Sequence, residues 1–195
     1  MKLVISLCVG ACLCVCAESV RAAEETNGDA AKLQKSRDTW DELKKKCHGN
    51  YRYFVRTSSF SGVRTETEVV VQKNKVAGRR YKVTGGSAAV LRIAPAVPGD
   101  RPAKPASPKY KWTERGTDIG GHKQGAPAKT LDELYADAAK AVAHALKPSE
   151  KRYLRFDARG LLKSCFYVDT RIADDAPTTG VIIAEIRLKG TGDKK

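Results

Sequence analysis

Carboxylates near the C-terminus are the side chains in this sequence whose type and spacing could do chemistry. The candidates are Asp157, Asp169, Asp174 and Asp175. Two carboxylates held close together, one of them with a raised pKa, can act as a general acid and a general base. Asp174 and Asp175 stand directly before Ala-Pro, however, where an aspartate commonly caps the backbone N–H groups of a turn. We therefore predict no catalytic residue, and keep as the alternative a hydrolase that acts on envelope polymers through Asp174 or Asp175.

The other reactive side chains lack the arrangement that an enzyme or a metal site needs. His122 follows a glycine pair and has no evident partner to orient its ring, and neither Ser87 nor Ser164 lies in a nucleophile elbow. Cys47 is followed by His48, but the cysteines and histidines lack the paired spacing of zinc ligands. No glycine-rich phosphate loop is present. The sequence therefore predicts neither a metal nor a cofactor.

The N-terminus has the order of a secretory signal peptide. A short basic start precedes an apolar run over 3–17, and Val20-Arg21-Ala22 has the small-residue pattern of a cleavage site. The run is too short to span a bilayer as a permanent helix. We predict a signal peptide over 1–23 and a secreted or periplasmic protein with no integral membrane segment after cleavage. Val9-Gly10-Ala11-Cys12 resembles a lipid-attachment box, so a form anchored through Cys12 or Cys16 is the alternative.

Cleavage of that signal would leave two cysteines, Cys47 and Cys165, because the other four of the six lie within it. An exported protein with two cysteines far apart in sequence most simply forms one disulfide. Closing so long a loop would stabilise the fold by ~4 to 5 kcal/mol if the effect is entropic. We predict a single disulfide between Cys47 and Cys165.

The chain is strongly basic. It carries 36 Lys and Arg residues against 22 Asp and Glu, a formal net charge of +14, and loss of Lys2, Arg21 and Glu18 with the signal leaves +13. Such a surplus favours contact with polyanions or acidic proteins, although a basic surface also aids solubility. No recognised nucleic-acid motif accompanies the charge. We therefore predict a non-catalytic envelope or extracellular binding module for an acidic protein or a polyanion.

Helix and strand signals recur over 31–190 in the order α-β-β-β-α-β-β-β, which indicates one α+β domain. Apolar positions at helical spacing predict helices over 31–46 and 131–146. Alternating and apolar runs bounded by turn residues predict six strands: 51–56, 65–71, 76–84, 152–157, 161–170 and 181–188. We expect the two helices to pack on one face of a single antiparallel sheet. Residues 24–30 and 191–195 are predicted to be disordered.

A segment rich in proline and glycine, 86–128, interrupts the domain. Six of the eight prolines lie in it, so no regular element of any length is expected there, and its charged residues leave a net +4. A loop this long is either functional or disordered. Tyr110-Lys111-Trp112 forms an aromatic and basic patch that could stack on a ligand, and we add Arg79 and Arg80 of the preceding strand to this candidate site. The alternative is that the aromatic rings fold back onto the core.

Two similar pentapeptides, Thr39-Trp40-Asp41-Glu42-Leu43 and Thr130-Leu131-Asp132-Glu133-Leu134, lie in the two predicted helices. In the second, Thr130 begins a capping box, because Glu133 follows three residues later. In the first, Thr39 falls within a helical pattern that has already begun, so it need not be a cap. The repeat therefore predicts acidic helix surfaces anchored by leucine, and not a site.

Several short motifs resemble those of a bacterial secreted protein family. They are Trp40, Tyr51-Arg52-Tyr53, Val69-Val70-Val71, Lys73-Asn74-Lys75-Val76, Thr130-Leu131-Asp132-Glu133-Leu134-Tyr135, Phe156-Asp157-Ala158-Arg159-Gly160-Leu161, Tyr167-Val168-Asp169 and Ile172-Ala173-Asp174-Asp175. In these motifs the chain resembles the domain-of-unknown-function family numbered six-one-seven-four over about residues 35 to 190, the proline-rich loop excluded. Asn74 stands where that family's turn glycine is expected. The resemblance implies export and a small α+β domain, and it implies no reaction.

Overall fold

The computed structural model describes residues 12–59, 62–85, 111–172 and 178–189, and for 12–26 it describes the backbone alone. Within these residues the regular elements comprise two α-helices, eight strands and one short 3-10 helix. In chain order they are α1 (Cys12–Lys46), β1 (Tyr51–Ser58), β2 (Arg64–Gln72), β3 (Lys75–Gly85), β4 (Lys111–Arg115), η2 (Gly116–Asp118), α2 (Leu131–Ala143), β5 (Glu150–Phe156), β6 (Leu162–Asp169), β7 (Thr179–Ile182) and β8 (Glu185–Leu188). The α+β class predicted from the sequence is confirmed.

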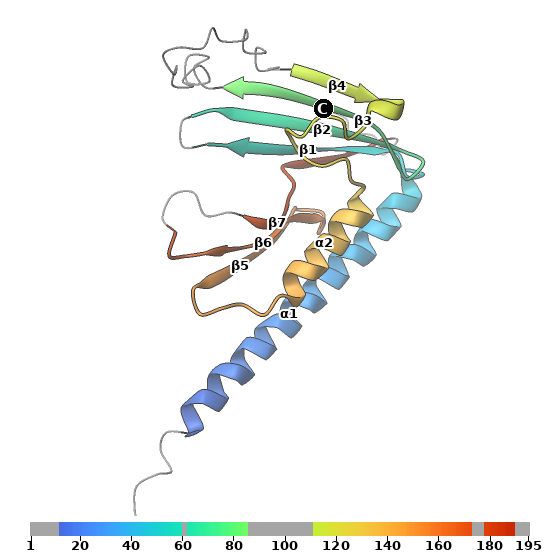
Figure 1. Ribbon diagram of the computed structural model, residues 1–195. Coiled ribbons are helices and arrows are strands. Elements are labelled where there is room, and N and C mark those ends of the chain that lie inside the picture. The colour runs from blue at the N-terminus through green and yellow to red at the C-terminus, as the bar shows by residue number, and fades with distance from the viewer. Residues whose placement is uncertain (1–11, 60–61, 86–110, 173–177, 190–195) are drawn as a thin grey trace, which may run out of the picture.

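The strands form two antiparallel sheets, and the prediction of a single sheet is wrong. The large sheet has five strands in the order β4-β3-β2-β1-β8, and the small sheet has three in the order β5-β6-β7 (Figure 1). The predicted last strand, 181–188, is divided between them. The Ile183 N–H donates to the Lys163 carbonyl (2.7 Å), and the next amide, that of Ala184, donates to the Phe54 carbonyl of β1 (2.7 Å). Because consecutive amides bond to different sheets, the chain crosses from one sheet to the other at this point.

The segment predicted to lack regular structure contains a strand, β4. It pairs antiparallel with β3, from Gly78 opposite Arg115 to Lys82 opposite Lys111. Its residues alternate between exposed and buried, as the two sides of a strand require. The prediction of a loop is therefore wrong over 111–118, where β4 and η2 lie.

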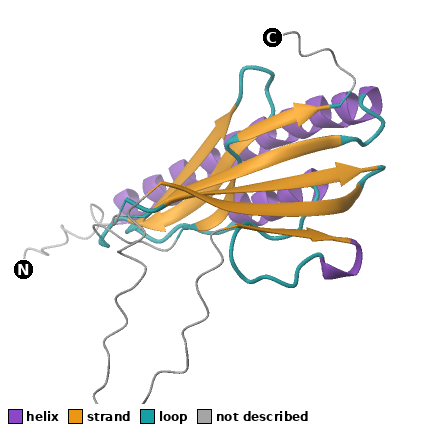
Figure 2. Cartoon of the chain, turned by 90° about the horizontal axis from the view of Figure 1, so that it is seen from above, coloured by secondary structure: helices purple, strands orange, loops and turns teal. Residues whose placement is uncertain are grey.

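Both helices lie on the same side of the large sheet, and Figure 2 shows them behind its strands. Helix α1 begins at Cys12, so residues 24–30, predicted to be disordered, belong to it. Its N-terminal turns extend past the sheets (Figure 1). One cluster of buried side chains joins the helices to both sheets; it includes Leu33, Trp40, Leu134, Tyr135, Tyr53, Val69, Ile186, Leu162 and Val181. Among the described residues, no helix has the length and apolar character needed to cross a membrane.

The two cysteines predicted to form a disulfide are free, so that prediction is wrong. Cys47 and Cys165 are both buried. The Cys47 thiol donates to the Lys44 carbonyl at the end of α1 (3.5 Å), and the Cys165 thiol donates to the Ala138 carbonyl of α2 (3.5 Å). Burial raises the pKa of the Cys165 thiol to about 11. Each thiol therefore packs in the core as a small apolar group beside a different helix.

The start of α2 has the predicted capping box. The Thr130 hydroxyl accepts a hydrogen bond from the Glu133 N–H (3.3 Å), and the Glu133 carboxylate accepts one from the Thr130 N–H (2.7 Å). Thr39, its counterpart in α1, lies inside the helix, where its hydroxyl donates to the Lys35 carbonyl (3.1 Å). The two pentapeptides thus have similar sequences but different roles.

Replacing Thr130 by alanine should lower the free energy of unfolding by about 1 kcal/mol. The Glu133 N–H loses its acceptor, and the Glu133 carboxylate, which accepts from the Thr130 N–H, loses its second bond to Thr130. Thr39→Ala is the matched control and should change the free energy by less than about 0.5 kcal/mol. Urea unfolding followed by circular dichroism measures both. Equal losses in the two variants would contradict the assignment of Thr130 as the cap.

Candidate functional site

The outward side of the large sheet carries a network of ion pairs, which we call the charged face. Six pairs form it: Arg56–Glu66 (2.7 Å), Lys82–Glu66 (2.8 Å), Arg80–Glu68 (3.2 Å), Arg52–Glu68 (3.4 Å), Arg56–Glu185 (3.5 Å) and Arg187–Glu185. Each of the three glutamates contacts two cations. Because side chains alternate along a strand, these residues share the side of the sheet that faces away from the helices.

Cations outnumber carboxylates on the charged face. The ion pairs contain five cations and three glutamates, an excess of +2. Lys111 lies directly opposite Lys82 in the register of β3 and β4, and Lys189 lines the same groove as Arg187, so the excess rises to +4. A hydrogen bond from Lys82 is the largest reason that the pKa of Glu66 lies below its ordinary value. The lowered pKa keeps the Glu66 carboxylate ionised at neutral pH.

A groove of about 780 Å³ lies in the charged face. Val70 is one of its lining residues, together with the longer side chains of Arg52 and Arg80. The Arg187 guanidinium lies 4.8 Å from the centre of the Phe54 ring, a cation–π contact that helps to hold it in place. An anionic group that enters the groove would meet cations whose positions are already restricted.

The predicted ligand-contact residues do not come together on one surface. Arg80 and Lys111 point outward on the charged face, whereas Arg79 and Trp112 point inward, with 3% and 6% of their surface exposed. Tyr110 lies outside the described residues. Adjacent residues of a strand point to opposite sides, so Arg79 and Arg80 cannot serve the same surface. Trp112 is buried, as the alternative expected, but it packs against Tyr81, His122 and Arg79 and is not part of the core cluster.

Arg79 and Glu114 form a buried ion pair behind the charged face. Glu114 is 1% exposed and accepts hydrogen bonds from Nε and Nη2 of Arg79, both at 2.8 Å. It also accepts from the N–H groups of Gly120 (2.8 Å) and His122 (2.7 Å), and His122 Nδ1 lies 2.9 Å from it. The Arg79 guanidinium holds the pKa of Glu114 far below its usual range. The imidazole of His122 stacks on the Trp112 ring, with 4.4 Å between the ring centres.

This buried group is suited to holding the chain in place, not to reacting. Both carboxylate oxygens of Glu114 already accept hydrogen bonds, so they have little capacity left to take a proton from a substrate. Arg79 donates further to the carbonyls of His122 (2.6 Å) and Ala126 (2.7 Å). These bonds fasten residues 116–126 to β3 and β4. The sequence analysis missed this arrangement, because Lys111-Trp112-Thr113-Glu114-Arg115 has one apolar residue and shows no clear alternation.

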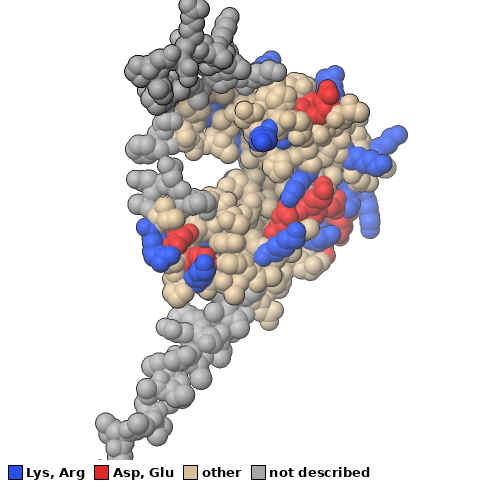
Figure 3. All heavy atoms as spheres, viewed as in Figure 1, with Lys and Arg blue, Asp and Glu red and all other residues tan. Residues whose placement is uncertain are grey.

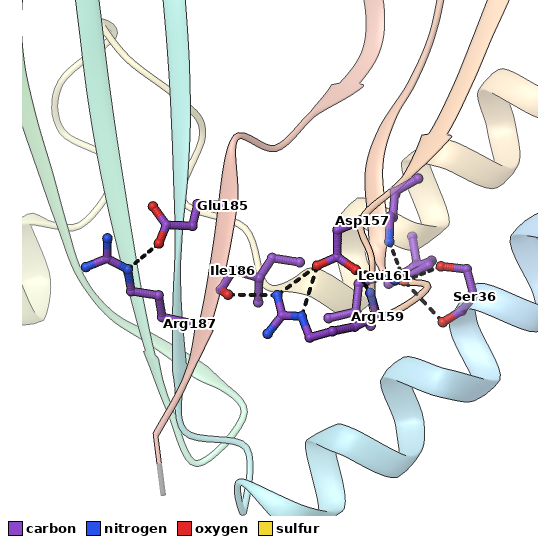
Figure 4. A network of polar contacts seen from close by, with 9 residues as sticks. Ser36, Asp157, Arg159, Leu161, Glu185, Ile186 and Arg187 are labelled. Atoms are coloured by element: carbon purple, nitrogen blue, oxygen red, sulfur yellow. Dashed lines mark hydrogen bonds and ion pairs between the residues drawn. The ribbon is translucent and has the colours of Figure 1, made fainter. Parts of the chain in front are cut away.

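Of the predicted carboxylates, Asp157 has a structural role in the turn between β5 and β6. It accepts hydrogen bonds from the Arg159 guanidinium (2.8 Å) and from the Leu161 N–H (3.0 Å). Arg159 also donates to the Ile186 carbonyl (2.9 Å), which ties this turn to β8 (Figure 4). The Asp157 carboxylate therefore has hydrogen-bond partners within the fold.

Asp169 lies at the other end of β6, where its carboxylate accepts from the guanidinium (2.6 Å) and the backbone N–H (3.0 Å) of Arg171. These bonds hold the pKa of Asp169 below its ordinary range. Asp157 and Asp169 are thus separated by the length of a strand and form no acid–base pair. Asp174 and Asp175 lie outside the described residues, so a hydrolase that uses them stays a prediction.

The described residues contain no group of three or more His, Cys, Asp or Glu side chains that could hold a metal ion. In Figure 3, acidic and basic side chains lie together over the helices. One ion pair between the two helices joins Lys44 to Asp132 (2.7 Å). The resemblance to the family numbered six-one-seven-four stays a prediction. The chain matches no family model, no curated protein and no solved structure.

Proposed function

We propose that this protein is an exported, non-catalytic module that binds an acidic protein or a polyanion of the cell envelope through the charged face. The observation that carries the proposal is the excess of cations around the groove. The cations that line it are Arg52, Arg80, Arg187 and Lys189, and the carboxylates are Glu68 and Glu185. The predicted net charge of +13 after cleavage supports the same kind of partner.

Two kinds of cation lie on the charged face. Arg52 and Arg80 are held by Glu68, so an incoming anion must compete with that carboxylate for them. Lys111 and Lys189 are exposed, and no carboxylate in the described part of the chain pairs with them. These two lysines can therefore meet an anion without first breaking an ion pair. All of these groups face water, so binding should weaken as salt screens them.

The double variant Lys111→Gln with Lys189→Gln should bind immobilised heparin more weakly than the unmodified chain and elute at lower salt. The plot of log affinity against log salt concentration should lose roughly two units of slope, about one for each cation that contacts the polymer. Because neither lysine belongs to the ion-pair network, the fold should be unaffected. Elution across a salt gradient and isothermal titration at several salt concentrations measure the two effects.

The matched control is the double variant Lys35→Gln with Lys45→Gln, which removes the same charge from exposed positions on α1. It should elute close to the unmodified chain, because those lysines lie on the helix side of the molecule. Equal shifts for the two double variants would show that net charge, and not the charged face, governs retention. Elution of the unmodified chain at very low salt would overturn the proposed function.

A further inference from the structure

A second groove, of about 770 Å³, lies between α1 and the C-terminal end of α2, and we call it the helix groove. In Figure 1 the two helices run side by side here, and α1 continues past the end of α2. Its apolar lining includes Ala30, Leu33, Tyr135, Ala139, Val142 and Leu146. The volume lies within the range of about 300–1,000 Å³ that small-molecule sites occupy.

Short side chains explain why the groove stays open. The helices are joined where the Ser36 and Tyr135 hydroxyls share a hydrogen bond (2.8 Å). One and two turns further along α2 the groove is lined by Ala139 and Ala143, whose side chains are too short to fill it. Leu146 at the groove's end is 38% exposed, although large apolar side chains are usually covered. The helix groove is thus an apolar surface that lacks a cover within the described structure.

The charged residues that line the helix groove are all basic, and no carboxylate is among its lining residues. Arg152 is already engaged, because it donates to the Ala141 (3.2 Å) and His144 (2.7 Å) carbonyls at the end of α2 and pairs with Asp29 (3.7 Å). Arg37 is half-buried at the groove, and no carboxylate in the described part of the chain pairs with it. A half-buried guanidinium beside an apolar channel favours an anionic group on an otherwise apolar ligand.

We propose that the helix groove binds a single-chain fatty acid, with its alkyl chain along the alanine-lined floor and its carboxylate on Arg37. Each methylene that leaves water for the groove adds to the affinity. The guanidinium supplies two parallel N–H groups that match the two carboxylate oxygens. The helix groove lies on the helix side of the large sheet, so this proposal does not depend on the charged face or on the function proposed for it.

Titration of the purified chain with a dansyl-labelled undecanoic acid tests the proposal through the rise in dansyl fluorescence. The unmodified chain should bind the probe saturably, and unlabelled palmitate should displace it. Arg37→Met should weaken binding about tenfold or more, because a hydrogen bond to a charged group is lost. Lys35→Met, on the same helix but away from the groove, should leave the affinity unchanged. The methyl ester of the probe should bind the unmodified chain as weakly as the acid binds the Arg37→Met variant.

Ala139→Trp fills the groove at an exposed position of α2, so it should abolish probe binding while circular dichroism and the melting temperature stay unchanged. Equal binding by the Ala139→Trp variant and the unmodified chain would overturn the proposal, as would an Arg37→Met variant with unchanged affinity. Binding of the chain to vesicles of anionic phospholipid is measured as well. Binding to such vesicles without binding to the free acid would show a membrane contact in place of a fatty-acid site. Heparin retention of the Ala139→Trp variant should be normal, which separates this result from a failure of the charged face.

Discussion

Glu114→Gln should lower the free energy of unfolding by about 3–5 kcal/mol, because it leaves the buried Arg79 guanidinium without its counter-charge. Glutamine keeps the shape of the side chain but places an amide against Arg79, where two charge-assisted hydrogen bonds stood at 2.8 Å. Domain stabilities are on the order of 5–15 kcal/mol in total, so the loss would be a large share. Urea unfolding at neutral pH, followed by circular dichroism, measures it.

Glu66→Gln is the matched control, since the Glu66 carboxylate also pairs with basic side chains but lies on the charged face. Its partners Arg56 and Lys82 are about half exposed, with 53% and 54% of their side-chain surface accessible. Exposed ion pairs contribute at most about 1 kcal/mol, so the control should lose no more than that. A loss below about 1 kcal/mol for Glu114→Gln would show that the buried pair adds little to the fold.

The contribution of Glu114 should also depend on pH in a defined direction. Arg79 holds the pKa of Glu114 well below its value in an unfolded chain. A carboxyl group with a lowered pKa stabilises the fold fully above the pKa of the unfolded chain and loses this effect as the pH falls through the folded-state pKa. The difference between the unmodified chain and Glu114→Gln should therefore be constant around neutral pH and shrink only in strong acid. A difference that shrinks already near pH ~7 would contradict the assignment of this effect to the Glu114 carboxyl group.

Local signals in the sequence predicted those elements that need no distant partner to be recognised. The apolar spacing over 131–146 and the capping pair of Thr130 and Glu133 predict α2, because both act within one or two turns of helix. Alternation likewise predicts β1, β2 and β3. The tight turn between β2 and β3 is formed by Lys73 and Asn74, which both have positive φ. These elements are present in the structure, although α2 ends at Ala143, three residues before the predicted end.

Signals that depend on distant residues were missed. The strand β4 buries a glutamate, and from the sequence alone Glu114 looks like a residue of an exposed loop. Only its contact with Arg79, 35 positions away, makes an inward position tolerable. The division of the last strand was missed for the same reason, since nothing in the type of Ile183 or Ala184 marks a change of sheet. The prediction of a disulfide was wrong because the number of cysteines does not show which helix each thiol packs against.

The candidate site was predicted only in part. Lys111 and Trp112 are adjacent in sequence, so they read as one patch, yet a strand sends them to opposite sides. The useful signal was that charged residues recur at every second position on neighbouring strands. These are Glu66 and Glu68 on β2 and Arg80 and Lys82 on β3. The register that pairs Glu68 with Arg80 and Glu66 with Lys82 is set by the turn and by the buried side of the sheet. The sequence shows the charges, and the register decides which of them meet.

Trp40→Ala should lower the free energy of unfolding by about 3–5 kcal/mol, the range for removing a large buried aromatic side chain. Trp40 is fully buried and meets the Tyr51 ring edge-on, with 4.8 Å between ring centres. Its indole N–H donates to the Asp132 carboxylate (3.4 Å), so the two pentapeptides identified in the sequence contact each other. The Tyr51 hydroxyl in turn accepts from the Leu131 N–H at the start of α2 (2.9 Å). One side chain therefore joins α1, α2 and the large sheet.

Two further variants separate the contributions of this contact. Trp40→Phe keeps an aromatic ring against Tyr51 and should lose less than Trp40→Ala, because the edge-on pairing is retained in part. Ile172→Ala is the control for apolar truncation at the surface; Ile172 is 46% exposed and should change stability by less than about 0.5 kcal/mol. Urea unfolding reports all three values. If Trp40→Ala lost no more than Ile172→Ala, the contact between the pentapeptides would not be what joins the helices to the large sheet.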